Sequence, residues 1–108
     1  INGIKGRFIL DTGASYIVLS NIFAKKSNIT IVPHSDIKLQ TANGEVTGVL
    51  TKADHVKLGK IEARFVPAVI LTRENALGPN IDGLLGMSFL SKFNIKFDHN
   101  YVVVETRK

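Results

Sequence analysis

The 108-residue sequence contains no cysteine, no tryptophan, only three prolines and no long apolar run. Without cysteine the chain has no disulfide, no thiol nucleophile and no cysteine-based zinc site, and its redox compartment stays undecided. No apolar stretch approaches the roughly 18 residues that a membrane-spanning helix needs, and no charged segment precedes a short apolar one as in a signal peptide. We therefore expect the residues as given to be soluble.

Acidic residues are the minority, with 9 aspartates and glutamates against 14 lysines and arginines and a net charge of +5. This balance leaves a nucleic-acid or anionic-surface binder open as an alternative. The basic residues are scattered, however, and the aromatic residues are not interleaved with them as stacking platforms would be. We therefore favour a lysine-rich solvated surface and expect no nucleic-acid partner.

The composition is that of a globular protein, 44% hydrophobic and 21% charged. Its length predicts one domain over residues 1–108 with one core. Short apolar segments rich in β-branched residues, separated by turn signals, predict an all-β fold. Because the chain starts at Ile1 within a pattern typical of a strand, we expect it to be a processed form or a soluble fragment of a longer chain.

Turn and capping signals divide the chain into predicted elements. Asn43-Gly44 between two alternating runs is the strongest short-range signal for a β-hairpin. Ser20 is a suitable N-cap for a short helix over residues 21–26, and Ser88 is expected to cap a second one that ends at Phe93. Strands are expected at residues 4–10, 16–19, 37–41, 45–50, 55–58, 61–66, 67–71, 81–86, 94–97 and 101–105, with a loop at 72–80.

A single carboxylate interrupts two hydrophobic runs in FILDTGASYIVLS, residues 8–20. Asp11 follows an apolar strand, and Gly13 permits a tight turn directly after it. Asp11 is either a turn aspartate that accepts backbone N–H groups or a carboxylate with a chemical role. Peptide hydrolysis through an unactivated water needs two facing carboxylates that share a proton. Because the chain has one Asp-Thr-Gly, the second carboxylate would come from another copy across a two-fold axis.

FILDTGAS, followed from residue 83 by GLLGMSFL, resembles the retropepsin-like aspartic proteases, and in particular their bacterial single-lobe members. The resemblance covers essentially the whole chain in order. It implies a retropepsin-like fold: a single-lobe closed β-barrel with a flap hairpin and one or two short helices. It also implies that activity requires a homodimer. Bacterial relatives are often membrane-anchored, so by analogy an envelope location through an anchor outside these residues is suggested.

The resemblance assigns roles within the Asp-Thr-Gly-Ala loop. Asp11 corresponds to the catalytic carboxylate, and Thr12 to the threonine that hydrogen-bonds across the dimer and locks the two loops together. Gly13 corresponds to the glycine that lets the loop turn. Ala14 corresponds to the alanine of retroviral-type enzymes, where two-lobed pepsins have a serine that donates to the carboxylate. Without that donor, the carboxylate pair is expected to keep its proton to a somewhat higher pH.

The family's flap is a hairpin that closes over bound peptide, and it corresponds here to residues 39–50. An ordinary surface hairpin remains an equal alternative from the residues alone. Leu84-Leu85-Gly86 corresponds to the family's second glycine signature, for which a structural role is implied. The resemblance assigns flap and substrate-binding roles to Thr41, Ala42, Asn43, Gly44, Glu45 and Val46.

Ser15 and Met87 depart from the retroviral pattern, in which an aspartate and an arginine at these positions pair with each other. Because both partners are absent together, no unpaired charge is left buried. This favours a different dimer arrangement over a broken site. The strand at 101–105 is a candidate for a dimer sheet, as the termini are in retropepsins.

We therefore predict an aspartic endopeptidase that acts on peptide or protein substrates without cofactor or metal, with a bell-shaped pH profile on the acidic side of neutral. His34, His55 and His99 lack metal-ligand spacing, and Asp82 is interpreted as a turn carboxylate. The alternative function is a retropepsin-fold domain that binds peptides or mediates dimerisation without cleaving them.

Overall fold

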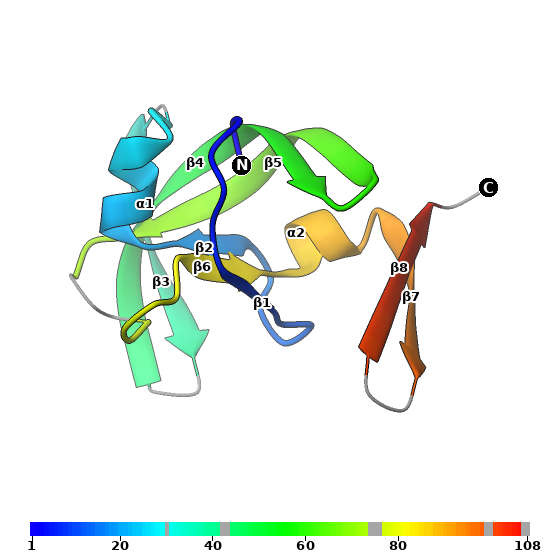
Figure 1. The fold of residues 1–108 in the computed structure, drawn as a ribbon. Coiled ribbons are helices and arrows are strands. Elements are labelled where there is room, and N and C mark those ends of the chain that lie inside the picture. Colours follow the sequence, from blue (N-terminus) through cyan, green and yellow to red (C-terminus); the bar gives the residue numbers. More distant parts are fainter. Residues whose placement is uncertain (30, 42–43, 74–76, 99–100, 107–108) are drawn as a thin grey trace.

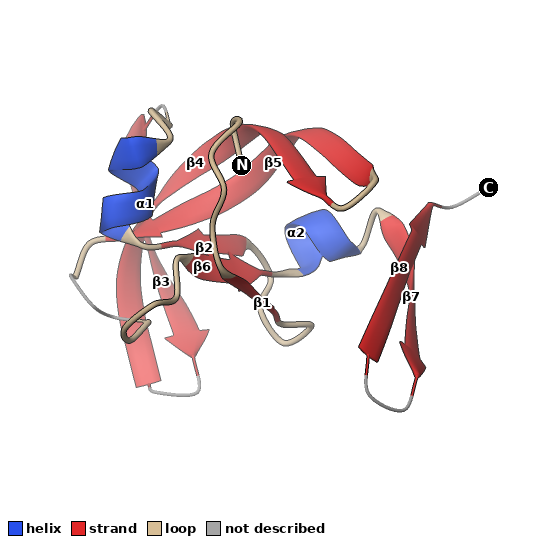
Figure 2. Ribbon diagram, in the orientation of Figure 1, coloured by secondary structure: helices blue, strands red, loops and turns tan. Residues whose placement is uncertain are grey.

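Strands dominate the computed structural model, which describes residues 1–29, 31–41, 44–73, 77–98 and 101–106 (Figure 2). This confirms the predicted all-β class. None of the helices in these ranges is long and apolar enough to span a membrane. The elements are β1 (Phe8–Leu10), β2 (Ile17–Leu19), α1 (Asn21–Lys26), β3 (Ile31–Thr41), β4 (Gly44–Leu58), β5 (Ile61–Leu71), β6 (Gly83–Leu85), α2 (Met87–Leu90), β7 (Phe93–Asp98) and β8 (Tyr101–Thr106).

Six of the strands form one curled sheet in the order β1-β6-β2-β5-β4-β3, and β7 and β8 form a separate antiparallel pair. Strands β1 and β6 are parallel, as are β2 and β5, and the other neighbours are antiparallel. The six-stranded sheet wraps into a half barrel, and the β7–β8 pair stands to one side of it (Figure 1). The expected closure of the barrel is not observed. In the described part of the chain β1 and β3 end the sheet, because they do not pair with each other.

Several predicted strand boundaries are wrong because pairing, rather than local sequence, sets them. The strands expected at 45–50 and 55–58 are one strand, β4, and those at 61–66 and 67–71 are β5. These two pair in one register from Gly48 opposite Leu71 to Leu58 opposite Ile61, with a break at Asp54 and Phe65. The strand expected at 4–10 is reduced to Phe8–Leu10, and the one at 81–86 to Gly83–Leu85, since only these residues pair with each other.

Helix α1 begins and ends where the sequence predicts. Ser20 is its N-cap, and the Ser20 hydroxyl accepts a hydrogen bond from the N–H of Phe23 at 3.1 Å. The helix buries Phe23 and Ala24. The ring of Phe23 meets that of Phe8 edge to face, with centroids 5.3 Å apart. This contact attaches α1 to β1, the strand that leads to Asp11.

Strand β2 is the most buried element of the sheet. Ile17 and Leu19 are 0% exposed and Val18 is 3% exposed, because β2 lies between β5 and β6. Burial of each such side chain stabilises the fold by roughly 1.5–3 kcal/mol. Since β2 begins just after the Asp11 turn, and β1 ends just before it, the core anchors both ends of that turn.

The β4–β5 ribbon changes its inward face near Phe65. Ala53 and Val66, which are paired, are both buried, but the next buried residue of β4 is Val56. Phe65 lies at this point of the partner strand β5, between Arg64 and Val66, which pair with His55 and Ala53. It is 60% exposed and has a φ of 55°, a left-handed conformation that is rare for a bulky residue. The alternation of inward and outward side chains therefore shifts by one residue. Beyond the shift, Val56 and Leu58 line a groove together with the N-terminal residues.

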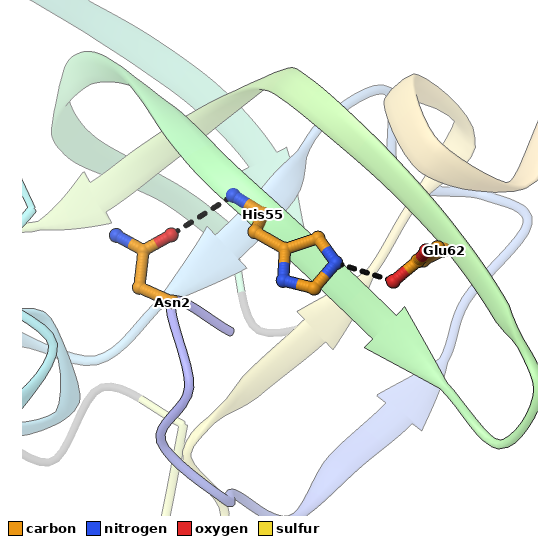
Figure 3. Close-up of polar contacts among 3 residues, drawn as sticks. All are labelled: Asn2, His55 and Glu62. Carbon is orange, nitrogen blue, oxygen red and sulfur yellow. Dashed lines mark hydrogen bonds and ion pairs between the residues drawn. The ribbon is translucent and has the colours of Figure 1, made fainter.

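His55 joins those N-terminal residues to the ribbon (Figure 3). The N–H of Asn2 donates to the carbonyl of His55 at 2.7 Å, and the N–H of His55 donates to Oδ1 of Asn2 at 3.0 Å. On the other side, Nε2 of His55 lies 2.6 Å from Oε2 of Glu62. The hydrogen bond and the charge of His55 lower the pKa of the exposed Glu62 carboxyl. The chain around Asn2 is thus held against β4.

Candidate active site

Asp11 stands at the end of β1, where the chain leaves the sheet. Its N–H donates to the carbonyl of Leu85 at 3.0 Å, so β6 fixes its backbone. The half-buried side chain accepts the N–H of Gly13 on Oδ1 at 2.9 Å, as a turn aspartate does. No hydrogen bond joins Oδ2 to any residue that the structure describes. One carboxylate oxygen therefore holds the turn, and the other is available to a water or a ligand.

The residues after Asp11 form a tight turn with an exposed tip. The N–H of Ala14 donates to the carbonyl of Asp11 at 3.2 Å, while Thr12 and Gly13 are exposed and Ala14 is half-buried. A Cβ at position 13 would lie 3.2 Å from Oδ1 of Asp11, so a side chain there would crowd the carboxylate. Glycine therefore lets the backbone N–H approach Asp11, and Thr12 is presented on the outside of the molecule.

A second segment, residues 85–88, holds this turn through its backbone. Besides the bond from Asp11 to Leu85, the N–H of Met87 donates to the carbonyl of Ala14 at 2.7 Å, and the N–H of Ser88 donates to that of Ser15 at 2.9 Å. The two segments lie so close that a Cβ on Gly86 would be 2.6 Å from the carbonyl oxygen of Ala14. Glycine at position 86 is therefore a condition for this contact.

Ser88 does not cap α2, contrary to the prediction. The N-cap is Gly86, which makes no side-chain hydrogen bond, and the helix ends at Leu90 before β7 begins. The Ser88 hydroxyl instead accepts the N–H of Ile17 at 2.9 Å and donates to the carbonyl of Pro67 at 2.7 Å. Ser88 thus ties the end of the Asp11 turn to β5. This link joins segments far apart in sequence, so no local pattern could have revealed it.

Replacing Ser88 by Ala should lower stability by about 1–3 kcal/mol, because it leaves the part-buried N–H of Ile17 and the carbonyl of Pro67 without their shared partner. Thermal unfolding measures the loss. Ser91→Ala is the matched control, since Ser91 is exposed and ends the same helix. Equal melting temperatures for the two variants would show that the Ser88 hydroxyl contributes nothing to the fold.

Asp82, the acidic residue next to β6, lies at the other end of the same strand pair. Its Oδ2 accepts the N–H of Arg7 at 2.8 Å, and its carbonyl accepts the N–H of Ser20 at 2.8 Å. Because β1 and β6 are parallel, Arg7 and Asp82 precede the two strands, whereas Asp11 follows them. Asp82 therefore acts as a structural carboxylate and does not face Asp11 within one chain.

The predicted hairpin is formed by β3 and β4. Leu39 pairs with Val46 and Thr41 with Gly44, and Gly44 has a φ of 104°, which favours glycine. Glu45 is exposed and lies 3.8 Å from Lys38 across the strands, while Val46 is half-buried. The hairpin extends past the end of the sheet (Figure 1). Two of its predicted flap residues, Ala42 and Asn43, lie outside the described residues.

The uncharged residues Ser15 and Met87 occur where the two supporting segments meet. Ser15 accepts a backbone hydrogen bond from the residue next to Met87, so the two positions are spatial neighbours. Backbone bonds hold the segments together here without an ion pair. Within the described residues, no three histidine or acidic side chains gather as metal ligands would.

Two comparisons with known proteins each match this chain to aspartic proteases. A family model described as aspartyl protease matches residues 1–89. The crystal structure of a retropepsin-like aspartic protease from Rickettsia conorii matches with a TM-score of 0.66 and 30% sequence identity, covering 91% of this chain and 78% of that chain. A search of curated proteins gave no match.

Proposed function

The chain belongs to the aspartyl protease family, and from this premise we propose that it is an aspartic endopeptidase active as a homodimer. Asp11 of each subunit would contribute one carboxylate to a shared site. The observation that carries the proposal is the position of Asp11: its turn is held by β6 and residues 85–88, while its Oδ2 has no hydrogen-bond partner among the residues that the structure describes. Because Asp82 lies at the opposite end of β1 and β6, a second Asp11 is the best source of the second carboxylate.

The proposed chemistry needs the two carboxyl groups to share one proton. Two carboxyl groups that face each other in one site do not both ionise, because their negative charges repel. The ionised Asp11 removes a proton from water, and the water oxygen adds to the scissile carbonyl carbon. The protonated Asp11 of the partner subunit gives its proton to the carbonyl oxygen. The tetrahedral diol then collapses: its C–N bond breaks, the leaving nitrogen takes the proton removed from water, and one hydroxyl proton returns to a carboxylate.

Two features support the dimer. Thr12 is presented at the tip of the Asp11 turn, where it can reach the equivalent turn of a second copy. Strands β7 and β8 pair only with each other among the described strands, and an isolated two-stranded sheet is marginally stable at best. We propose that both contribute to the dimer interface.

The hairpin of β3 and β4 is proposed to act as the flap over a bound peptide. Strands that extend beyond their sheet can add backbone hydrogen bonds to an extended substrate, and closure excludes water from the reacting bond. On this proposal Thr41 to Val46 contact the substrate. Peptides and proteins are the substrate class.

Mixing wild-type protein with the Asp11→Asn variant tests whether two aspartates act together. If subunits exchange at equal amounts, about one quarter of the dimers would hold two wild-type subunits. Cleavage per wild-type subunit should therefore fall to about half, because mixed dimers have one carboxylate. The readout is hydrolysis of a peptide mixture, followed by mass spectrometry between acidic and neutral pH.

Three results of this mixing experiment are distinguishable. A halved rate per wild-type subunit supports the shared site. An unchanged rate, with subunit exchange demonstrated by native mass spectrometry, would show that one chain is sufficient. A wild-type protein that binds a statine-type transition-state mimic but cleaves no peptide at any pH would instead be the non-catalytic binding domain.

A further inference from the structure

The β3–β4 hairpin separates from the rest of the sheet at Thr47. Strand β4 pairs with β5 only from Gly48 onwards, and Gly48 lies opposite Leu71, the last residue of β5. The residues of β4 before Gly48 pair with β3 alone among the described strands. Because an isolated two-stranded ribbon is marginally stable at best, the orientation of the hairpin depends on what holds its base.

Thr72, the first residue after β5, holds this base with two hydrogen bonds. Its N–H donates to the carbonyl of Thr47 at 3.3 Å, and its hydroxyl donates to the same carbonyl at 3.1 Å. A backbone carbonyl has two lone pairs and can accept both. Any residue except proline could make the first bond, but the second requires a short side chain that carries a hydroxyl. The type of side chain at position 72 therefore matters.

Gly48 supplies no side chain that could anchor the hairpin instead. It is buried, and a Cβ there would overlap Cγ1 of Val69 and lie 3.0 Å from the carbonyl oxygen of Ile70. Val69 thus fills the space that a side chain at position 48 would need. Since Thr47 itself is exposed, the bonds from Thr72 are well placed to set the direction in which the hairpin leaves β5.

One face of the sheet connects the base of the hairpin to Asp11. Residues paired across neighbouring strands share a face, as do residues two apart in one strand. By this rule Gly48 lies on the same face as Ile9, which precedes Asp11 by two positions. The residues that connect them across β5, β2 and β6 are Leu71, Val69, Val18 and Leu84. The angle of the hairpin at its base therefore decides how it lies over the face that leads to Asp11.

We propose that Thr72 is a positioning residue for the β3–β4 hairpin: its hydroxyl holds the carbonyl of Thr47 and keeps the hairpin at an angle that suits a peptide bound beside Asp11. This inference rests on the proposed function, because it takes the hairpin to be the flap. It adds to that function a residue that lies outside the hairpin. Thr72 acts through Thr47 and not on the reacting bond, so loss of its hydroxyl weakens peptide binding and leaves the chemistry at Asp11 unchanged.

Thr72→Val and Thr72→Ser form a matched pair of variants. Valine keeps the shape of threonine without its hydroxyl, whereas serine keeps the hydroxyl and loses the methyl group. For a peptide that wild type cleaves, Thr72→Val should raise KM about 3- to 10-fold, as expected for the loss of one neutral hydrogen bond. It should change kcat less than about 2-fold, because the hairpin contacts the bound substrate and the transition state alike. Thr72→Ser should restore KM to within about 2-fold of the wild-type value.

Amide hydrogen exchange, followed by NMR, gives a readout that does not depend on cleavage. In Thr72→Val we expect the amide at position 72, corrected for its intrinsic rate, to exchange at least about 3-fold faster than in wild type. The amides of residues 50–58, where β4 pairs with β5, should keep their rates. The melting temperature should change by less than about 2 °C, because the contact is exposed and local.

Equal exchange at position 72 in wild type and both variants would overturn the proposal, whether or not the protein cleaves peptides. An unchanged KM in Thr72→Val would also overturn it, as would a serine variant that is impaired as much as the valine variant. A wild type that cleaves no peptide would contradict the proposed function instead. In that case the exchange comparison would still decide whether the Thr72 hydroxyl holds the hairpin.

Discussion

Asp11→Asn is expected to abolish peptide cleavage while leaving the fold intact. A general acid–base pair contributes about 10²–10⁴-fold to a rate. The variant homodimer has an amide in place of both Asp11 carboxylates, and an amide can act neither as the acid nor as the base. The fold should persist because the asparagine oxygen can still accept the N–H of Gly13, as Oδ1 of Asp11 does at 2.9 Å. We expect the melting temperature to change by less than about 2 °C.

The experiment compares cleavage of a peptide mixture by wild type, Asp11→Asn and Asp54→Asn at matched pH. Asp54 is an exposed aspartate of β4, so Asp54→Asn makes the same change of charge and should keep full activity. Retention of cleavage by Asp11→Asn would refute the assignment. Loss of activity in both variants would show that net charge, and not the position of Asp11, is responsible.

Local signals in the sequence predicted the elements that depend on neighbouring residues. The cap at Ser20 placed helix α1 over Asn21–Lys26, because capping is an interaction between residues three apart. Asn43-Gly44 predicted the existence of the β3–β4 hairpin for a similar reason. It did not predict the register, because Gly44 belongs to β4 and pairs with Thr41. The apolar runs on both sides of Asp11 marked it as a candidate, but they left a turn aspartate and a chemical role open. Only the family resemblance assigned it an expected catalytic role.

Features that depend on distant residues were not predictable. Ser88 has the local appearance of a helix cap, but its hydroxyl bonds Ile17 and Pro67, which reach it only in the folded sheet. The boundaries of β1 are set by the length of β6, and local propensity does not encode that length. Phe65 was equally unpredictable, because a left-handed backbone is rare for a phenylalanine.

Three elements position Asp11 and its turn. Asp11 directly follows strand β1, and its N–H donates to the carbonyl of Leu85 in β6. The N–H groups at the start of α2 donate to the carbonyls of Ala14 and Ser15. The Asp11 turn therefore depends on a segment more than seventy positions away, so its position is set by the close contact between two backbones. The residue that permits this contact, Gly86, is the most sensitive point of the arrangement.

Gly86→Ala should destabilise the fold by about 3 kcal/mol and lower cleavage about 10²-fold in the molecules that remain folded. A Cβ at this position would lie 2.1 Å from the carbonyl oxygen of Tyr16 and 2.6 Å from that of Ala14. Backbone oxygens cannot rotate away as a side chain can, so the Asp11 turn has to move. A displacement of about 1 Å in a catalytic group is sufficient for such a loss of rate.

Gly59→Ala is the control for Gly86→Ala, because it separates the effect of a crowded Cβ from the effect of an unfavourable backbone conformation. Gly59 has a φ of 60° and open space around its Cβ position, so alanine there should cost only about 1–2 kcal/mol for the left-handed conformation and leave cleavage unchanged. Thermal unfolding and cleavage at a temperature where both variants are folded give the two comparisons. If Gly86→Ala matched Gly59→Ala in activity, the Asp11 turn would tolerate displacement, and residues 85–88 would support the fold without setting the geometry of the carboxylate.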